Sequence, residues 1–517
     1  MTANAYSQQI EQVLPQVLAL FDVDSTSMSY GQGDRYYWAW GLIDFPNGTF
    51  QGAAHGLARL WINGLWPYST SQSLFLQRID AIFSATSKMT RKDGSLEEAF
   101  PNEGSFCVTA LVAYDLLCTL DLLHDINEEE VSFRWQSVIR PLIDYLKENN
   151  ETHALISNHL ATAVAALSRW HDLTGDERAQ VRAKSILNDI LKNQSNEGWF
   201  EEYGGADPGY QSLCTYYLAD VHKRHPEWGL LNPLTKSIQF LWLFAHPDGS
   251  FGGPYGSRCT RFYYPAGFEA LADEIPEAGA LATFMRNSID RKCVVTLVTM
   301  DPPNLAPMFN AYCWAATLTN KARSALTLPV MESQSWRKVF RHGGLLVDRG
   351  ENHYTIVSTA KGGVIVHYVD QKLQLINSGV VIKSPANKLG SSHYAGNHEI
   401  KYDSDNRLLV KTEIAAMPKA SPTTFQFLVI RFLSFTLFRF TGIREWFKQK
   451  LVKLLITKNK IWPVINERTI SLGENLKFDD ETDMPEGYSK VKNAHNFVPI
   501  HMASQGYWQI QDEEKIL

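Results

Sequence analysis

The chain has 517 residues, a formal net charge of −6 and an isoelectric point near 6.2. This length predicts about two to four domains, and 44% hydrophobic with 20% charged residues is the composition of a folded globular protein. The absence of a basic excess argues against nucleic acid as a partner.

The N-terminus reads MTANAYSQQIEQVLPQV, without the basic region and apolar run of a secretory signal. The six cysteines are widely spaced and form no CxxC pair, a pattern typical of reduced thiols in cytosolic proteins. We therefore expect a cytoplasmic protein without a structural zinc site, a bound metal or a cofactor.

From residue 1 to about residue 325 the apolar residues recur at helical spacing, as in 106–123 and 177–193. Loops with glycine beside an acidic residue, such as KDGS (92–95) and PDGS (247–250), join these segments. The pattern predicts paired helices stacked in an array or in a closed ring.

After about residue 335 the pattern changes to short, β-branched segments separated by Gly, Asn or Asp. HGGLLVDRG (342–350), GGVIVHYVD (362–370) and RLLVKTEIA (407–415) are examples. They predict antiparallel strands, most simply arranged as a sandwich.

Residues 424–456 interrupt the strands with helical spacing and a strong positive bias. Across 419–460, nine Lys and Arg residues stand against Glu445 alone. Arg431 and Arg439 break the apolar run, which argues against a membrane span. Two interpretations remain: a helical excursion that covers the sheet, or a basic amphipathic segment that lies on an anionic membrane surface.

Asn158 and His159 stand side by side where a predicted buried helix begins. Polar side chains that face a core are costly unless something pairs with them. The pair is therefore either a binding site or a helix-start amide beside a satisfied core imidazole.

Three further stretches, 29–45, 196–217 and 247–269, carry more Tyr, Trp and Arg than turns require. A cleft lined by such residues suits an acidic sugar chain, because aromatic rings stack on sugar faces and Arg pairs with carboxylates. Hydrophobic plugs and an Arg258 buried against Glu269 are the alternative interpretation. The candidate substrate-binding residues are Arg35, Tyr37, Trp38, Tyr203, Gln211, Arg258, Tyr264 and Glu269.

The motif SNH (157–159), followed by EGWF (197–200) and DPGYQ (207–211), resembles the heparinase II/III-like polysaccharide lyases and alginate lyases of the same architecture. The block YGSRCTRFYYPAGFE (255–269) resembles heparinase-like proteins encoded beside bacterial surface-polysaccharide synthesis genes. The resemblance implies an α+β multidomain chain with an incomplete (α/α) toroid followed by antiparallel β-sheets. We place the toroid at 1–333 and the β-sandwich at 334–517, with the basic helical insertion at about 424–456.

The family's chemistry assigns roles by position. Asn158 and His159 match the pair that binds a uronate carboxylate and stabilises the enolate-like state formed when the C5 proton leaves. Tyr210 matches the tyrosine that acts as base, as acid or as both, with Tyr216 and Tyr217 as fallbacks. Such lyases also use a histidine of the β-domain, for which the candidates are His367 and, in RHGG, His342.

Three functions stay open at this point. A lyase would cleave a uronic-acid-containing glycan by β-elimination, and a uronyl C5-epimerase would return the proton from the opposite face instead. A non-catalytic glycan-binding protein would keep only the cleft. The expected partner is an acidic polysaccharide or a lipid-linked oligosaccharide, with membrane contact through 424–456 and activity in exopolysaccharide or lipopolysaccharide metabolism.

Overall fold

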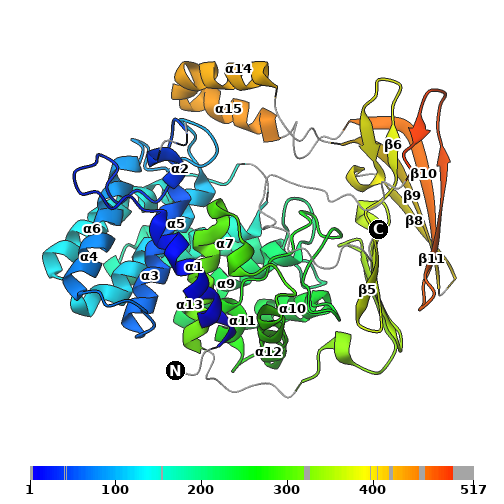
Figure 1. Ribbon diagram of the computed structural model, residues 1–517, viewed down its shortest axis with the longest axis horizontal. Helices are drawn as coiled ribbons and strands as arrows, with labels where there is room; N and C mark the ends of the chain where they lie inside the picture. The colour runs from blue at the N-terminus through cyan, green and yellow to red at the C-terminus, as the bar shows by residue number, and fades with distance from the viewer. Residues whose placement is uncertain are drawn as a thin grey trace.

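A computed structural model of the chain describes residues 4–39, 41, 43–152, 155–318, 326–395, 398–404, 406–417, 423–452 and 460–492. It consists of a helical region and two antiparallel sheets (Figure 1). The expected fold class, a toroid of helices followed by a β-sandwich, is confirmed.

The contacts between helices define an inner ring at the centre of the helical region. In order around the ring these helices are α3 (Ala53–Ile62), α5 (Phe106–Leu123), α7 (Ser157–Thr174), α9 (Pro208–Arg224), α11 (Ala266–Leu271) and α13 (Pro302–Leu318). Each packs against the next, and α13 returns to α3. The resemblance implies an incomplete toroid, whereas here the inner ring closes.

An outer set of helices covers the ring. It comprises α1 (Ala5–Ala19), α4 (Gln72–Met89), α6 (Glu129–Glu148), α8 (Glu177–Lys192), α10 (Leu231–Leu241) and α12 (Pro276–Asp290), with the short α2 (Arg35–Trp38) after α1. The inner α5 is apolar on all sides and mostly buried, whereas the outer α8 buries a single apolar face. The segment Phe106–Ile126 is long and apolar enough to cross a membrane, but 78% of its apolar window is buried inside the ring.

The first sheet is a meander in the order β1-β2-β3-β4-β5. Its strands are β1 (Trp336–Phe340), β2 (Leu345–Arg349), β3 (His353–Ser358), β4 (Val364–Val369) and β5 (Lys372–Asn377). The last ring helix ends at Leu318 and β1 begins at Trp336, so the expected boundary at 333–334 lies in the connection between them.

The second sheet has the order β11-β10-β9-β7-β6-β12, with β8 also paired to β9. Its strands are β6 (Val381–Lys383), β7 (Leu389–Ser391), β8 (His398–Ser404), β9 (Arg407–Ala416), β10 (Ile461–Ser471), β11 (Lys477–Asp483) and β12 (Ser489–Lys490).

The central strands β2, β3 and β4 of the first sheet are buried on both faces, whereas the edge strands β1 and β5 are partly exposed. Along β4, Val364, Val366 and Tyr368 belong to the core that continues into the helical region, whereas Ile365 packs with Leu408 and other residues of the second sheet. Because successive side chains of a strand alternate between faces, helices cover one face of this sheet and the second sheet covers the other.

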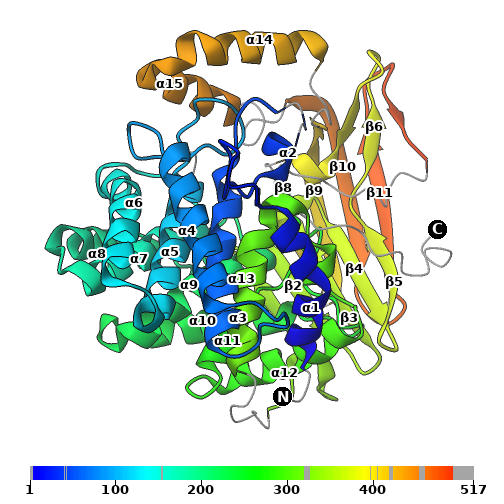
Figure 2. The ribbon, with the colours of Figure 1, turned by 60° about the vertical axis from the view of Figure 1, so that its left-hand side comes forward.

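Two helices, α14 (Thr424–Phe435) and α15 (Thr441–Val452), form a helical hairpin between β9 and β10. Figures 1 and 2 show it lying over one end of the helical region. Arg431 of α14 pairs with Asp44, and Arg444 of α15 pairs with Asp93. The expectation that this excursion covers the sheet is therefore wrong, because its described contacts go to the loops of the helical region.

Candidate active site

The start of α7 is tied to the segment that precedes α9. Ile156 forms a β-bridge with Glu202, and the Ser157 N–H donates to the Glu201 carbonyl over 3.1 Å. Asn158 donates twice to the Glu202 carboxylate, from its backbone N–H (2.9 Å) and from Nδ2 (2.7 Å). The Glu202 carboxylate therefore caps the α7 N-terminus and fixes the Asn158 amide.

Glu202 is fully buried beneath this pair. Burial raises the pKa of Glu202 well above its usual range, and the hydrogen bonds from Asn158 oppose that rise. A carboxyl group that is readily protonated repels an acidic ligand less than a fixed carboxylate does, so Glu202 suits a site for anions.

His159 lies beside Asn158 and is held by a different carboxylate. Its Nδ1 is 2.7 Å from Glu151 Oε2, and its ring meets the Tyr203 ring edge-on with centroids 6.2 Å apart. A carboxylate on Nδ1 fixes the imidazole orientation, which leaves Nε2 as the nitrogen for a ligand.

Tyr203, Tyr210 and Arg258 gather next to His159. The Arg258 guanidinium lies 4.0 Å from the Tyr203 ring centroid, and the Tyr203 and Tyr210 rings are 6.4 Å apart. Arg258 is buried, yet its Nε has no hydrogen-bond partner. A buried cation with an unused donor is the feature expected where an anionic ligand binds.

Asp207 joins the two loops that carry these residues. Its carboxylate caps α9 by accepting from the backbone N–H of Tyr210 over 3.1 Å. It also accepts from the backbone N–H of Arg258 over 2.9 Å. The Thr260 hydroxyl donates to the same carboxylate. Tyr203 and Cys259 adopt the left-handed backbone conformation, with φ of 55° and 59°, although neither is glycine. Such strain persists only where surrounding contacts impose it, and it is concentrated at functional sites.

The ionisation of Tyr210 depends on its surroundings. Burial raises the pKa of Tyr210 above its usual value, and the neighbouring Arg258 charge opposes the rise. The phenol therefore keeps its proton at neutral pH in the free site, and Arg258 favours the phenolate.

The N-termini of three ring helices reach this cluster. The α7 and α9 starts carry Asn158 and Tyr210, and Cys107 at the start of α5 is close enough to affect the pKa of Tyr203 and of Tyr210. Helix N-termini carry partial positive charge and favour anions.

Two predicted substrate-binding residues serve the fold instead. Gln211 is fully buried and accepts from the Phe200 N–H over 3.3 Å while it donates to Ser237 Oγ over 2.8 Å. Glu269 accepts from the Tyr6 hydroxyl over 2.7 Å and pairs with Arg286 at 2.9 Å. The expectation that Gln211 and Glu269 face a ligand is wrong, and the cation paired with Glu269 is Arg286, not Arg258.

Tyr264 and the fallback tyrosines are buried. Tyr264 is 2% exposed, lies within electrostatic range of Tyr210 and meets the Phe262 ring edge-on. Tyr216 and Tyr217 contact Tyr114 of α5 inside the ring, and their hydroxyls have no hydrogen-bond partner. Tyr210, which is only half-buried, is thus the better placed candidate.

Arg35, Tyr37 and Trp38 belong to α2, and the side chains of Arg35 and Trp38 contact the end of α1. Arg35 donates to the Ala19 carbonyl, Trp38 donates to the Leu20 carbonyl, and the guanidinium lies 5.0 Å from the indole centroid. The structure does not bring these side chains into the cluster of Tyr203 and Arg258, so their substrate contact stays a prediction.

His367 lies on the wrong face of its strand to join this site. Its Nδ1 is 2.7 Å from Thr355 Oγ1, and its Nε2 is 3.1 Å from the carbonyl of Glu474, beside the second sheet. It shares a strand face with Ile365, away from the helices. The prediction that His367 is catalytic is therefore wrong. The other candidate, His342, is exposed in the β1–β2 turn, where its backbone N–H donates to the Glu197 carboxylate.

A histidine that the sequence analysis did not select comes closer. His393, in the short helix η8 (Ser392–Tyr394), is buried with its Nε2 3.5 Å from Cys259 Sγ, next to Arg258. The Lys361 ammonium also reaches the Ser257 carbonyl at 3.0 Å. The β-domain thus supports the 257–260 loop. The signal in the sequence is SSHYAGNH (391–398), a stretch with two histidines and no strand alternation.

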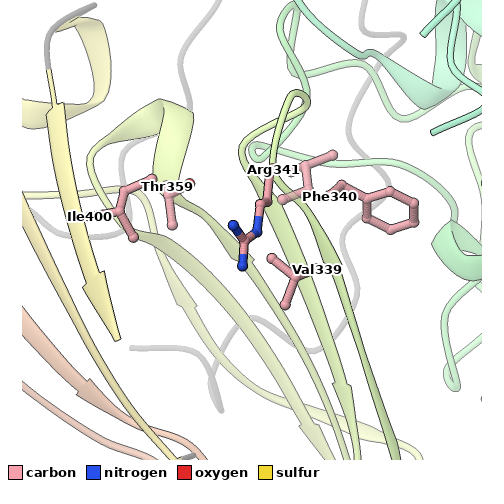
Figure 3. A pocket seen from close by; sticks show the side chains of 6 residues that line it. Val339, Phe340, Arg341, Thr359 and Ile400 are labelled. Carbon is pink, nitrogen blue, oxygen red and sulfur yellow. The ribbon is translucent and has the colours of Figure 1, made fainter. Parts of the chain in front are cut away.

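A pocket of about 270 Å³ lies elsewhere, in the β-region. Figure 3 shows the Arg341 guanidinium between Thr359 and Val339, with Phe340, Leu345 and Ile400 completing the lining. Arg341 is the single ionisable side chain of this lining, so the pocket offers no acid and base pair. Within the described part of the chain, no group of three or more His, Cys, Asp or Glu side chains is placed to hold a metal ion.

No family model matches the sequence, and no curated protein matches it. Among solved structures, heparinase III has a TM-score of 0.52 at 11% identity over 91% of this chain and 69% of its own. The chondroitin AC lyase of Streptomyces coelicolor A3 has a TM-score of 0.48 at 10% identity over 80% of this chain and 66% of its own. The cellobiose 2-epimerase of Bacillus thermoamylovorans B4167 has a TM-score of 0.44 at 11% identity over 61% of this chain and 98% of its own. The chain has the heparinase-III-like fold that the resemblance implied.

Proposed function

We propose that the chain is a polysaccharide lyase that cleaves a uronic-acid-containing glycan by β-elimination. The observation that carries the proposal is Arg258, a buried cation with an unpartnered Nε, stacked on Tyr203 and near Tyr210. The fold shared with heparinase III supports a carbohydrate-active enzyme. Its substrate in this proposal is an acidic chain of the exopolysaccharide or lipopolysaccharide kind, free or lipid-linked.

The first step is binding of the uronate carboxylate. One Nδ2–H of Asn158 donates to Glu202, and the amide has a second N–H for a ligand. This donor and the Arg258 guanidinium hold the carboxylate and stabilise the negative charge that develops when C5 loses its proton. Because Glu202 fixes the amide in advance, little reorganisation is needed during the reaction.

The second step is elimination, with Tyr210 as base and then acid. The Tyr210 phenolate takes the C5 proton, the C4–O bond breaks, and a C4–C5 double bond forms. The Tyr210 phenol then gives its proton to the departing oxygen, which regenerates the phenolate. Arg258 favours the phenolate form that starts this cycle.

A uronyl C5-epimerase is the second candidate. The observation in its favour is that two titratable groups, His159 and Tyr210, both contact the Tyr203 ring. An epimerase needs two such groups, one to remove the C5 proton and one to return a proton from the opposite face.

The test is to incubate the purified chain with a panel of uronate polysaccharides and to follow ultraviolet absorbance. A lyase creates an unsaturated uronate end that absorbs, and we expect the signal with wild-type protein and its loss with Tyr210→Phe. Glycan binding without any absorbance, on every polysaccharide of the panel, would overturn the lyase proposal.

A further inference from the structure

The α14–α15 hairpin presents large apolar side chains to solvent. On α14, Phe425 is 74%, Leu428 60%, Phe432 67% and Phe435 56% exposed. Their spacing of three, four and three residues puts them on one side of the helix. Phe440 (64%) and Trp446 (60%) are exposed elsewhere on the hairpin, and we call these six exposed side chains together the apolar face.

The opposite side of the hairpin is polar and already occupied. Arg431 Nη1 is 3.0 Å from Asp44 Oδ1, and Arg444, which is 2% exposed, lies 3.5 Å from Asp93 Oδ2. Asn102 Nδ2 donates to the Ser434 carbonyl over 2.9 Å.

Phe438 is the apolar side chain that anchors this attachment, buried against Phe100 with ring centroids 6.0 Å apart. Arg431 and Arg444 therefore face the protein, whereas the apolar face is turned to water, so the hairpin exposes side chains of the kind that a surface helix ordinarily buries. An exposed apolar surface of this kind marks an interaction site.

The charge of the hairpin identifies what covers the apolar face. Arg439, Lys450 and Lys460 are exposed on it or at its end, and the sequence 419–460 has nine Lys and Arg against one Glu in a chain of net charge −6. Basic residues beside Phe and Trp suit an anionic lipid surface.

Helix length decides how such a surface is engaged. Each helix has 12 residues, or about 18 Å at 1.5 Å per residue, against about 30 Å for a hydrocarbon core. The helices are too short to span a bilayer and suit its interface. We propose that the α14–α15 hairpin docks the protein on an anionic membrane, with the apolar face inserted at the boundary between headgroups and acyl chains.

Docking in this way would turn one end of the ring toward the membrane. Asn102, which holds α14, lies just before α5, and Cys107 at the start of α5 is within electrostatic range of Tyr203. The candidate active site would then face glycans carried on lipids. This consequence rests on the proposed function, whereas the docking itself does not.

Vesicle co-sedimentation of the full chain tests the docking without any activity. We expect binding to vesicles of phosphatidylglycerol and phosphatidylcholine, at least tenfold weaker binding to phosphatidylcholine alone, and loss of binding as salt rises. Phe425→Ser with Phe432→Ser should lower binding at least tenfold. Phe133→Ser, which alters a side chain 71% exposed on α6, is the matched control and should change nothing.

Fluorescence measures insertion directly. Brominated lipid should quench a component of the tryptophan emission that is missing in Trp446→Phe. Absence of vesicle binding, or equal loss with Phe133→Ser, would overturn the proposal. So would a dimer in sedimentation equilibrium that Phe432→Ser dissociates, because the apolar face would then belong to a second copy.

Discussion

Asn158 meets the buried carboxylate of Glu202 twice, through its backbone N–H at 2.9 Å and through Nδ2 at 2.7 Å. The two residues are 44 positions apart, and the paired bonds join the start of α7 to the segment before α9. The side-chain amide of Asn158 at the start of α7 is therefore hydrogen-bonded and fixed in orientation. It is held by Glu202, and its second Nδ2–H is the donor that we propose for the ligand.

Asn158→Ala should lower turnover by roughly two to three orders of magnitude, the size expected for loss of one oxyanion donor. It should also lower the free energy of unfolding by about 1–3 kcal/mol, because Glu202 loses a hydrogen bond while buried. Asn310→Ala is the control, since Asn310 binds Gly56 and Gly52 far along the chain from the site loops. It should cost comparable stability and keep the turnover of the folded enzyme. Equal losses of turnover in both variants would remove Asn158 from the site.

Tyr210→Phe should abolish turnover while glycan binding persists, because the ring stays and the proton-transferring hydroxyl is lost. Tyr203→Phe is the matched variant: the ring that stacks on Arg258 remains, and we expect most of the activity to remain. Steady-state kinetics with a binding assay separates the two. Activity in Tyr210→Phe together with inactivity in Tyr203→Phe would transfer the catalytic role to Tyr203.

The pH profile should reflect the raised pKa of Tyr210. Below that pKa the phenolate fraction grows tenfold per pH unit, so kcat/KM should rise with pH across the neutral range. Arg258→Met removes the charge that lowers the pKa and should move the rise to higher pH, whereas Arg258→Lys should move it less. A profile that is flat between neutral and alkaline pH, or unaltered in Arg258→Met, would contradict Tyr210 as the base.

Glu269→Ala should destabilise the fold without touching the chemistry. It removes the acceptor of the Tyr6 hydroxyl and the partner of Arg286. Breaking a buried ion pair costs roughly 3 kcal/mol, which denaturant unfolding would detect. The KM of the folded variant should stay at the wild-type value. A large rise in KM at unchanged stability would restore Glu269 as a substrate-binding residue.

Much of the candidate site could be predicted from the sequence, although the roles of its residues stay predictions. Asn158, His159, Tyr203, Tyr210 and Arg258 were all selected, and the structure gathers them. The reason is physical: turns between helices do not require Tyr and Arg, and the loops that begin ring helices converge at one end. The resemblance added the pairing of an SNH motif with a downstream tyrosine.

The errors also have physical reasons. The sequence does not distinguish a buried structural Gln or Glu from one that binds a ligand. Only the partners in the folded chain, Ser237 for Gln211 and Arg286 for Glu269, show that these two residues are structural. The sequence of β4 predicts that His367 and Ile365 lie on the same face of the strand, because successive side chains alternate. It does not predict which of the two faces the helices cover. Pairing over 44 residues, as between Asn158 and Glu202, leaves no local pattern.

The partners of the α14–α15 hairpin could not be predicted from the sequence either. Helical spacing and positive charge in 424–456 were evident, yet the inward direction of Arg431 and Arg444 was not. Their partners Asp44 and Asp93 lie more than 300 residues earlier in the chain.

The most direct test is to incubate the enzyme with uronate polysaccharides in heavy water and to follow ultraviolet absorbance together with C5 deuterium by NMR. The account predicts rising absorbance with wild-type protein, and none with Tyr210→Phe. Deuterium at C5 of intact chains without absorbance would contradict the lyase and establish the epimerase. Bound glycan with neither signal would contradict both and leave a glycan-binding protein.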